Sequence, residues 1–260
     1  MSGELAGYSI IVTGSARGMG AATVRTYAAA GADVVAMDIA DAGAEVAASG
    51  AEGTTGTVRF MRLDVADADS VTRAFDDAVT HLGKLDVLAH PAAIQRPGDA
   101  ANVTAEDWDM MFAVNVRGTM LTNQSAHRHM KSNPSGGSII NFGSVSGLRP
   151  EPVAPAYSAS KGAVHSWTRT AAAAWGVDSV RVNAILPAIA TPMYQEAIAA
   201  MTDDQKQAHY WQNEASIAMG QRYGDAHRDL GPVMIFFASQ GSKFISGQLI
   251  PVDGGQTSVR

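Results

Sequence analysis

Short apolar runs rich in Val and Ile recur along the chain and alternate with longer stretches of helical periodicity. Some runs are apolar throughout, such as Ile10-Ile11-Val12, which is typical of strands covered by helices on both faces. The pattern predicts seven strands, at residues 9–13, 33–38, 58–64, 85–89, 138–142, 180–186 and 248–252. It predicts helices near residues 18–30, 67–82, 104–130, 155–175, 194–218 and 225–238.

This alternation predicts an α/β fold with a doubly wound, seven-stranded parallel sheet flanked by helices on both faces. The sequence contains no internal repeat, low-complexity tract or linker, so we expect a single domain over residues 1–260. In such sheets ligands bind outside the carboxyl ends of the strands. Functional residues are therefore expected directly after the predicted strands.

Composition and charge exclude several classes of protein. The chain has 46% hydrophobic residues and no cysteine, which excludes disulfide frameworks, thiol nucleophiles and Cys-ligated metal centres. Its net charge of −6 disfavours nucleic acid as a partner. The N-terminal residues lack the pattern of a signal peptide, and no run of about 18 apolar residues occurs. We expect a cytoplasmic protein that does not interact with membranes.

A glycine-rich stretch follows the first predicted strand, where residues 13–20 read Thr-Gly-Ser-Ala-Arg-Gly-Met-Gly. Glycines at 14, 18 and 20 suit a tight turn, close approach of the backbone to a pyrophosphate, and close helix packing. The free N–H groups of the following helix favour a phosphate. Turns use glycine without any ligand, so the triplet alone would also fit an ordinary turn. Its place between a strand and a helix favours a dinucleotide site.

Asp38 ends the second predicted strand, close to the ~20-residue offset at which an acidic residue receives a ribose 2′-hydroxyl. A carboxylate there repels a 2′-phosphate, which favours NAD over NADP. Arg17 in the glycine loop acts in the opposite direction, so NADP remains possible. The alternative is that Asp38 only caps a helix or turn.

Tyr157 and Lys161 are four residues apart on a predicted helix and therefore share one face. A nearby ammonium lowers the pKa of a phenol, so the pair is a plausible device for proton transfer. Ser144 lies two residues beyond the strand at 138–142, where its hydroxyl could polarise a carbonyl. The alternatives are a packed ring beside a solvated amine, and a turn serine.

Asn115 falls on the same stripe as Trp108, Met111 and Phe112 of the helix predicted from residue 104. An amide among apolar residues must be hydrogen-bonded. It either fastens the helix to backbone groups or holds a water that leads to Lys161, and the sequence does not separate these roles.

Together, the loop at 13–20, Asp38, Asp64-Val65, Asn115, Ser144, Tyr157 and Lys161 resemble the short-chain dehydrogenase/reductase family, in its shorter, single-domain subtype. The resemblance covers nearly the whole chain. It implies a Rossmann fold and hydride transfer between a nicotinamide cofactor and a ketone or secondary alcohol. It also implies a role for each of four residues: Tyr157 as general acid/base, Ser144 positioning the reacting oxygen, Lys161 lowering the tyrosine pKa and binding the nicotinamide ribose, and Asn115 maintaining a water-linked proton path.

The resemblance further implies cofactor contacts from the residues Gly14, Ser15, Arg17, Gly18, Met19, Gly20, Asp38, Asp64, Val65, Ala92, Tyr157, Lys161, Pro187, Ile189 and Thr191. By the same resemblance, Asp64 accepts from adenine N6, Val65 offers a backbone contact, and Ile189 and Thr191 meet the nicotinamide carboxamide.

The chain departs from the family pattern at two places. It has His90-Pro91-Ala92-Ala93 where Asn-Asn-Ala-Gly is usual, and Pro187-Ala188 where Pro-Gly is usual. We interpret His90 as a buried residue that replaces a structural asparagine.

Three further expectations concern metal, substrate and assembly. His127 and His129 are two apart on a predicted helix and face different ways, so we expect no metal site. The segment at about 190–224 is expected to cover the substrate, and its aromatic and Met side chains form either an apolar pocket or ordinary helix core. Small residues on the helix at 155–175, with the resemblance, suggest a homotetramer.

Two other functions are weaker interpretations. A non-catalytic dinucleotide sensor would not need Ser144, Tyr157 and Lys161 together. A nicotinamide-using epimerase or dehydratase usually carries a larger second substrate domain. The favoured prediction is therefore an alcohol dehydrogenase or carbonyl reductase.

Overall fold

Seven parallel strands form the central sheet in the order β3-β2-β1-β4-β5-β6-β9. The computed structural model describes residues 3–257. The strands are β1 (Ser9–Thr13), β2 (Asp33–Asp38), β3 (Val58–Arg62), β4 (Val87–His90), β5 (Gly137–Phe142), β6 (Val180–Pro187) and β9 (Leu249–Val252). The order reverses between β1 and β4, which is the point at which doubly wound sheets bind their ligands.

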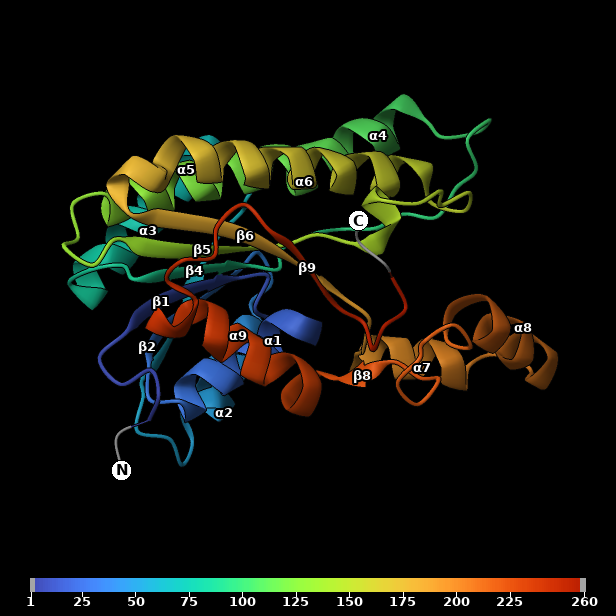
Figure 1. The fold of residues 1–260 in the computed structure, drawn as a ribbon, viewed down its shortest axis with the longest axis horizontal. Coiled ribbons are helices and arrows are strands. Elements are labelled where there is room, and N and C mark those ends of the chain that lie inside the picture. Colours follow the sequence, from blue (N-terminus) through green and yellow to red (C-terminus); the bar gives the residue numbers. More distant parts are fainter. Residues whose placement is uncertain (1–2, 258–260) are drawn as a thin grey trace.

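Helices cover both faces of this sheet, as Figure 1 shows. One face carries α1 (Gly18–Ala29), α2 (Gly43–Ala51) and α9 (Gly231–Ala238). The other carries α3 (Ala68–Leu82), α5 (Gly118–Met130) and α6 (Pro155–Trp175). The predicted α/β sheet with helices on both faces is confirmed.

Shorter elements gather beyond the carboxyl ends of the strands (Figure 1). They include α4 (Ala105–Met111), α7 (Pro192–Ala199), α8 (Asp203–Asn213) and a small parallel pair, β7 (Ile189–Ala190) with β8 (Gly224–Asp225). Two π-helical turns, η1 (Phe112–Arg117) and η4 (Ala226–Leu230), and three 3₁₀ turns, η2 (Val145–Gly147), η3 (Gly176–Asp178) and η5 (Gln240–Ser242), complete the described elements. The carboxyl edge is thus the edge that carries extra structure.

Three helical predictions differ from the structure. Helix α2 was not predicted, because its sequence GAEVAASGA is dominated by Gly and Ala and shows little periodicity. The helix predicted at 194–218 is two helices, since Thr202 starts α8 with a capping box whose partner is Gln205. The helix predicted at 104–130 is continuous but contains the π-helical turn η1, which is a local change of helical register.

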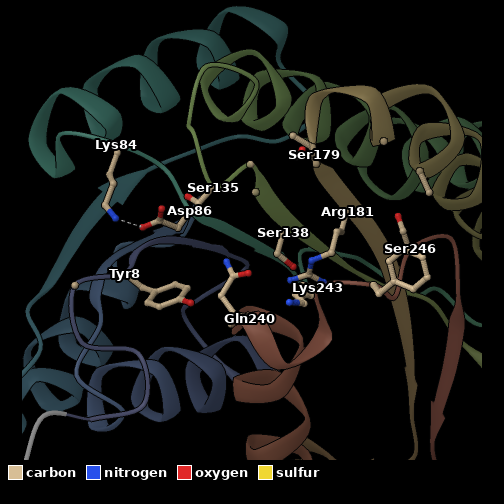
Figure 2. Close-up of a pocket in the computed structure, with 18 of the residues that line it drawn as sticks. Tyr8, Lys84, Asp86, Ser135, Ser138, Ser179, Arg181, Gln240, Lys243 and Ser246 are labelled. Atoms are coloured by element: carbon tan, nitrogen blue, oxygen red, sulfur yellow. Dashed lines mark ion pairs between the residues drawn. The ribbon is translucent and has the colours of Figure 1, made fainter.

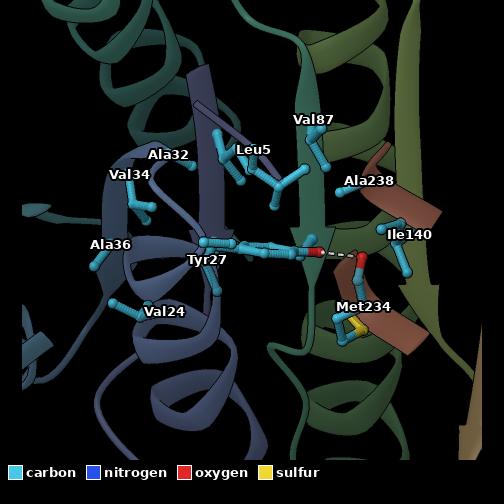
Figure 3. Close-up of a cluster of buried hydrophobic side chains, with 14 of the residues drawn as sticks. Leu5, Val24, Tyr27, Ala32, Val34, Ala36, Val87, Ile140, Met234 and Ala238 are labelled. Atoms are coloured by element: carbon cyan, nitrogen blue, oxygen red, sulfur yellow. Dashed lines mark hydrogen bonds between the residues drawn. The ribbon is translucent and has the colours of Figure 1, made fainter. Parts of the chain in front are cut away.

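Two apolar cores lie between the sheet and its helical layers. The core on the α1 side includes Tyr27, which is fully buried and donates its hydroxyl hydrogen to the carbonyl oxygen of Met234 over 3.4 Å (Figure 3). Burial raises the pKa of Tyr27 far above its usual value. The core on the α3 side is centred on Phe75 and Met130. Together they hold the strands in a fixed register, which fixes the relative positions of the strand ends.

The amino edge of the sheet carries a cavity of about 880 Å³, shown in Figure 2. There Asp86 is 8% exposed, accepts from the backbone N–H of Ser9 over 2.9 Å and pairs with Lys84 over 2.8 Å. Arg181 donates to the carbonyl oxygen of Phe237 over 3.0 Å at the end of α9. Charged groups at this edge therefore fasten neighbouring elements together.

No helix within residues 3–257 is both long and apolar enough to span a membrane.

Candidate active site

Tyr157 and Lys161 lie on the first turns of α6, at the carboxyl edge of the sheet. Pro155 begins this helix, where its missing N–H costs no hydrogen bond. The ammonium nitrogen of Lys161 is 5.5 Å from the centre of the Tyr157 ring and donates to the carbonyl oxygen of Phe142 over 2.8 Å. Lys161 is only 4% exposed. The predicted shared face of the two side chains is therefore present.

Burial dominates the ionisation of this pair. It raises the pKa of Tyr157, an interaction with the Ser144 side chain lowers it, and the charge of Glu151 raises it again. Burial also lowers the pKa of Lys161 to about 8. The sequence led us to expect a lowered tyrosine pKa, whereas burial, the largest cause, raises it and outweighs the interaction with Ser144.

Ser144 follows β5 and caps the short turn η2. Its Oγ accepts from the backbone N–H of Ser146 over 3.1 Å, and its own N–H donates to Nε2 of His165 over 3.3 Å. Accepting this hydrogen bond uses a lone pair of the hydroxyl oxygen and not its hydrogen, so Ser144 keeps a hydrogen to donate. Ser144 can therefore donate to a substrate oxygen beside the Tyr157 phenol.

Asn115 lies in the π-helical turn η1 and is 1% exposed. Its Oδ1 accepts from the N–H of Ile94 over 2.8 Å, and its Nδ2 donates to the carbonyl oxygen of Ile94 over 2.9 Å and to Oγ of Ser160 over 3.0 Å. These hydrogen bonds show the fastening role, one of the two that the sequence left open. The amide joins η1 to the segment after β4 and to the residue before Lys161.

The glycine loop between β1 and α1 fits a phosphate group. Gly14 has a φ of +60°, and a Cβ atom there would lie 2.7 Å from Cα of Ala92. The Oγ of Ser15 is buried and has no hydrogen-bond partner among residues 3–257. Helix α1 has no side-chain cap and no acidic residue in its first turn, so its amide groups are free to bind an anion. Gly18, Met19 and Gly20 form that first turn.

Asp38, at the end of β2, binds the glycine loop itself. One carboxylate oxygen accepts from the N–H of Ala16 and the other from the N–H of Ala40, each over 2.9 Å. Arg17, the cation of the glycine loop, is exposed. The structure thus shows the turn-bracing role that was the alternative for Asp38, and this role leaves its further lone pairs available.

The other predicted cofactor contacts follow their strands at the same edge. Asp64 accepts from the N–H of Ala66 over 2.9 Å, and Val65 is buried beside Gly118. Pro187 ends β6, Ile189 is 9% exposed, and Thr191 caps α7 by accepting from the N–H of Tyr194 over 3.2 Å.

Both departures from the family pattern are accommodated. His90 is 2% exposed, and its Nδ1 is 2.8 Å from the hydroxyl of Thr13 and 3.2 Å from that of Thr122. Burial and the charge of Lys161 lower its pKa to about 3. The interpretation of His90 as a buried residue is confirmed. Ala188 donates its N–H to the carbonyl oxygen of Val252 over 2.9 Å, so the chain passes this point without glycine.

The histidines of α5 point in different directions, as expected. Nε2 of His127 is 2.7 Å from Asp178, and Nε2 of His129 is 2.9 Å from Asp76. Within residues 3–257 no three His, Asp or Glu side chains are grouped as metal ligands.

The segment at 190–224 does not gather its large apolar side chains into one pocket. Met193, Trp211 and Met219 are 55%, 68% and 76% exposed. The hydroxyl of Tyr194 instead donates to Glu214 over 2.5 Å and lies 3.0 Å from Nε2 of His209. Its ring meets that of Tyr223 edge to face, with centres 4.9 Å apart. The three exposed side chains thus belong neither to an apolar pocket nor to helix core, the two alternatives that the sequence left open.

Sequence reasoning missed two residues beside Ser144 and Tyr157. His165 is 1% exposed and binds the Ser144 backbone, and Glu151 accepts from the hydroxyl of Ser146 over 3.2 Å. A signal for His165 was present, because it lies four residues beyond Lys161 and therefore on the same helix face. No comparable spacing marks Glu151, which precedes the helix.

Comparisons with known proteins agree over nearly the full length. A family profile described as "Enoyl-(Acyl carrier protein) reductase" matches residues 14–257. A probable galactose dehydrogenase of Rhizobium meliloti is 33% identical, with 97% of this chain and 96% of the relative covered. A D-threitol dehydrogenase of Mycolicibacterium smegmatis is 33% identical, with 98% and 94% covered. The solved structure of a short-chain type dehydrogenase/reductase from Mycobacterium ulcerans is similar with a TM-score of 0.88 at 28% identity, covering 97% of this chain and 90% of that one.

Proposed function

Because the chain belongs to the short-chain dehydrogenase/reductase family, and is thus an NAD(P)-dependent oxidoreductase acting on alcohols or ketones, we propose that Tyr157 is its general acid and base. The observation that carries this proposal is the convergence of Tyr157, Lys161 and Ser144 at the carboxyl edge of the sheet, the edge that also carries the glycine loop. A nicotinamide cofactor, when bound, supplies the hydride acceptor or donor.

The protein's own groups then handle the proton and the reacting oxygen. The Ser144 hydroxyl donates to the substrate oxygen and orients it toward the Tyr157 phenol. In the reductive direction the phenol gives its proton to that oxygen, and the raised pKa of Tyr157 keeps this proton in place at neutral pH. In the oxidative direction the phenol must first ionise, and the Lys161 ammonium stabilises the phenolate. Asn115 acts by holding the segments that carry these groups.

We place the cofactor along the carboxyl edge between the glycine loop and β6. The free amides of α1 and the unpartnered Ser15 hydroxyl suit its phosphates. The roles proposed for the remaining residues are adenine contacts from Asp64 and Val65, and contacts to the nicotinamide end from Ala92, Pro187, Ile189, Thr191 and Lys161. A Cβ atom at Gly18 would lie 3.8 Å from the Thr191 side chain, so the two ends of this path approach each other across the loop.

We propose NAD as the preferred cofactor, since the Asp38 carboxylate ends β2 beside the glycine loop, where we expect it to receive the ribose 2′-hydroxyl, while Arg17 is exposed. Kinetics with both cofactors test this. The wild-type protein should favour NAD by at least about tenfold in kcat/KM, which is about 1.4 kcal/mol. Asp38→Asn, which keeps an acceptor oxygen but removes the charge, should reduce that preference. Equal or better use of NADP by the wild type would contradict the proposal.

For the substrate we propose a polyhydroxylated secondary alcohol or its ketone. The relatives named above act on galactose and D-threitol by their names. Burial and the charge of Glu214 raise the pKa of Tyr223, and the charges of Arg149 and Glu151 also act on it. We propose that segment 190–224, which carries Tyr223 and Glu214, covers the substrate opposite the polar loop that follows Ser144. Polar side chains on both sides suit a substrate with several hydroxyls.

A substrate panel separates this from an apolar preference. Sugars and linear polyols should give higher kcat/KM than cyclic or aliphatic alcohols with one hydroxyl, and Glu151→Gln should raise KM for the polyols more than it lowers kcat. A preference for the apolar alcohols would contradict this choice of substrate without touching the role of Tyr157.

The role of Tyr157 is tested by Tyr157→Phe, with turnover followed by the absorbance of the reduced nicotinamide. Turnover should fall by about 10²- to 10⁴-fold while cofactor binding is retained. The matched control is Tyr8→Phe, a tyrosine at the amino edge, which should leave turnover unchanged. Undiminished rates in Tyr157→Phe would refute the assignment.

We also propose a homotetramer. A shallow apolar groove of about 870 Å³ runs along η1, α5 and α6, and its lining includes Phe112, Ala113, Met120, Val164 and Trp167. Apolar helix faces of this kind pair with copies of themselves in symmetric assemblies. Light scattering at micromolar concentration should give a mass near four times 27.1 kDa, and a monomer would overturn the proposal.

A further inference from the structure

The imidazole of His165 occupies the concave side of the loop that carries Ser144. Position 165 lies one helical turn beyond Lys161 on α6, and the side chain is 1% exposed. A Cβ atom at Gly143 would lie 2.5 Å from Nε2 of His165, and one at Gly147 would lie 2.7 Å from its Cε1. The glycines on either side of Ser144 therefore allow the loop to close around the ring.

One hydrogen bond joins the ring to the backbone of Ser144. The N–H of Gly143 still pairs with β6, donating to the carbonyl oxygen of Ile185 over 2.8 Å. The N–H of Ser144 is the first beyond the sheet, and it donates to Nε2 of His165 over 3.3 Å. The side-chain oxygen of Ser144 is held separately by Ser146. The position of the serine hydroxyl thus depends on an acceptor supplied by α6.

The acceptor is available because the imidazole is neutral. Burial, followed by the charges of Lys161 and Arg169, lowers the pKa of His165 to about 4. With Nε2 accepting, the ring hydrogen must be on Nδ1, and this buried Nδ1 has no hydrogen-bond partner within residues 3–257. An unpartnered buried N–H is destabilising. An aliphatic side chain would avoid that cost, so the presence of histidine calls for a reason beyond packing.

We propose that His165 is a positioning residue that fixes Ser144 against the Tyr157 phenol through the Ser144 N–H···Nε2 hydrogen bond. The proposal rests on the role of Ser144 described above. Tyr157, Lys161 and His165 then lie four residues apart along one face of α6, and His165 sets the position of Ser144 through its backbone. A loosened hydroxyl lowers turnover steeply, because a displacement of about 1 Å at reacting groups costs up to ~10²-fold.

The test compares two amides that differ in reach. In His165→Gln the side-chain oxygen reaches the position of Nε2, whereas in His165→Asn it falls one methylene short. We expect His165→Asn to lower kcat by about 10- to 100-fold and His165→Gln by less than about threefold. Cofactor dissociation constants, measured by protein fluorescence, should stay unchanged in both. His127→Asn, on α5 and paired with Asp178, is the matched control and should keep wild-type kcat.

A second arm places the same substitutions in Ser144→Ala. If His165 acts through the serine hydroxyl, His165→Asn should lower the residual kcat of Ser144→Ala by less than about twofold, although it destabilises both backgrounds equally. An equal loss in both backgrounds, or wild-type kcat in His165→Asn alone, overturns the proposal for His165 only. Wild-type kcat in Ser144→Ala would overturn the role of Ser144, and the proposal for His165 with it.

A measurement on the wild-type protein guards against poor folding of the variants. Nitrogen-15 NMR of the histidine-labelled protein reports which ring nitrogen carries hydrogen, with assignment from His165→Gln. We expect hydrogen on Nδ1 and a bare, hydrogen-bonded Nε2. Hydrogen on Nε2 would exclude the hydrogen bond from Ser144 and end the proposal.

Discussion

Buried polar groups lie at both the amino and the carboxyl ends of strands β4, β5 and β6. The groups at the two ends differ in their surroundings. Before β4, Asp86 has a cation and a backbone N–H as partners. At the carboxyl ends, Lys161 has a carbonyl oxygen but no carboxylate, and His90 and His165 each have one ring nitrogen without a partner in the described residues. At the amino end the charge of Asp86 is paired, and the pair stabilises the fold. At the carboxyl end the charge of Lys161 has no opposite charge beside it, and shifted pKa values of this kind are typical of catalytic sites.

The largest effect should come from removing the uncompensated charge. Lys161→Met should lower kcat/KM for alcohol oxidation by about 10³-fold, because the phenolate of Tyr157 loses its stabilising ammonium. The melting temperature should stay the same or rise, since burial already disfavours this charge and lowers its pKa to about 8. Nicotinamide absorbance and calorimetry measure the two quantities. A clear fall in melting temperature would show that Lys161 also stabilises the fold, which would remove the contrast between the edges.

A smaller effect concerns stability in acid. His90 and His165 have folded-state pKa values lowered to about 3 and about 4, against about 6.5 in the unfolded chain. Below about pH 6.5 the unfolded chain therefore binds protons that the folded protein does not. Their contribution to stability is complete above that pH and is lost as the pH falls toward 4 and 3, at about 1.4 kcal/mol per pH unit for each imidazole.

Urea unfolding between pH 7 and pH 5 checks this contribution. The free energy of unfolding should fall with pH less steeply in His165→Gln than in the wild type. His227→Gln, at an exposed position, is the control and should keep the wild-type slope. Identical slopes in all three proteins would mean that the buried imidazoles take up protons as readily as exposed ones.

The amino edge should respond in the opposite sense from Lys161. Asp86→Ala leaves the buried N–H of Ser9 without an acceptor and Lys84 without its partner, so it should cost about 2 kcal/mol of stability. The cation contributes little of this, because Lys84 is about half exposed. Turnover below the melting temperature should be unchanged. A tenfold loss of kcat would show that the two edges are coupled.

Much of this organisation was predictable from the sequence. The apolar runs located all seven strands of the sheet, and residues at or just beyond their ends, such as Asp38 and Ser144, lie at its carboxyl edge. Five of the seven strands have ends that shifted by one or two residues, because pairing with neighbours, and not hydropathy, ends a strand. Helix α2 escaped because Ala and Gly carry little hydrophobic contrast.

The site was less predictable wherever its geometry depends on contacts distant in the sequence. The π-helical turn that holds Asn115 leaves no signature in residue spacing, and the partner of that amide, Ile94, is fixed only by the fold. The direction of the Tyr157 pKa was wrong because spacing reveals the ammonium but not the extent of burial. The contact between His165 and Ser144 could not be predicted from the sequence, because it depends on how the loop at 143–147 folds around the imidazole ring.

The carboxylate of Asp38 bears on attempts to redesign the cofactor preference. Because the same group holds the amides of Ala16 and Ala40, replacing it to admit a 2′-phosphate also unties the phosphate loop from β2. A useful variant must restore an acceptor for Ala16 while giving up the negative charge. Asp38→Asn keeps only one of the two acceptor oxygens, so a change of cofactor preference at this position is tied to the order of the glycine loop.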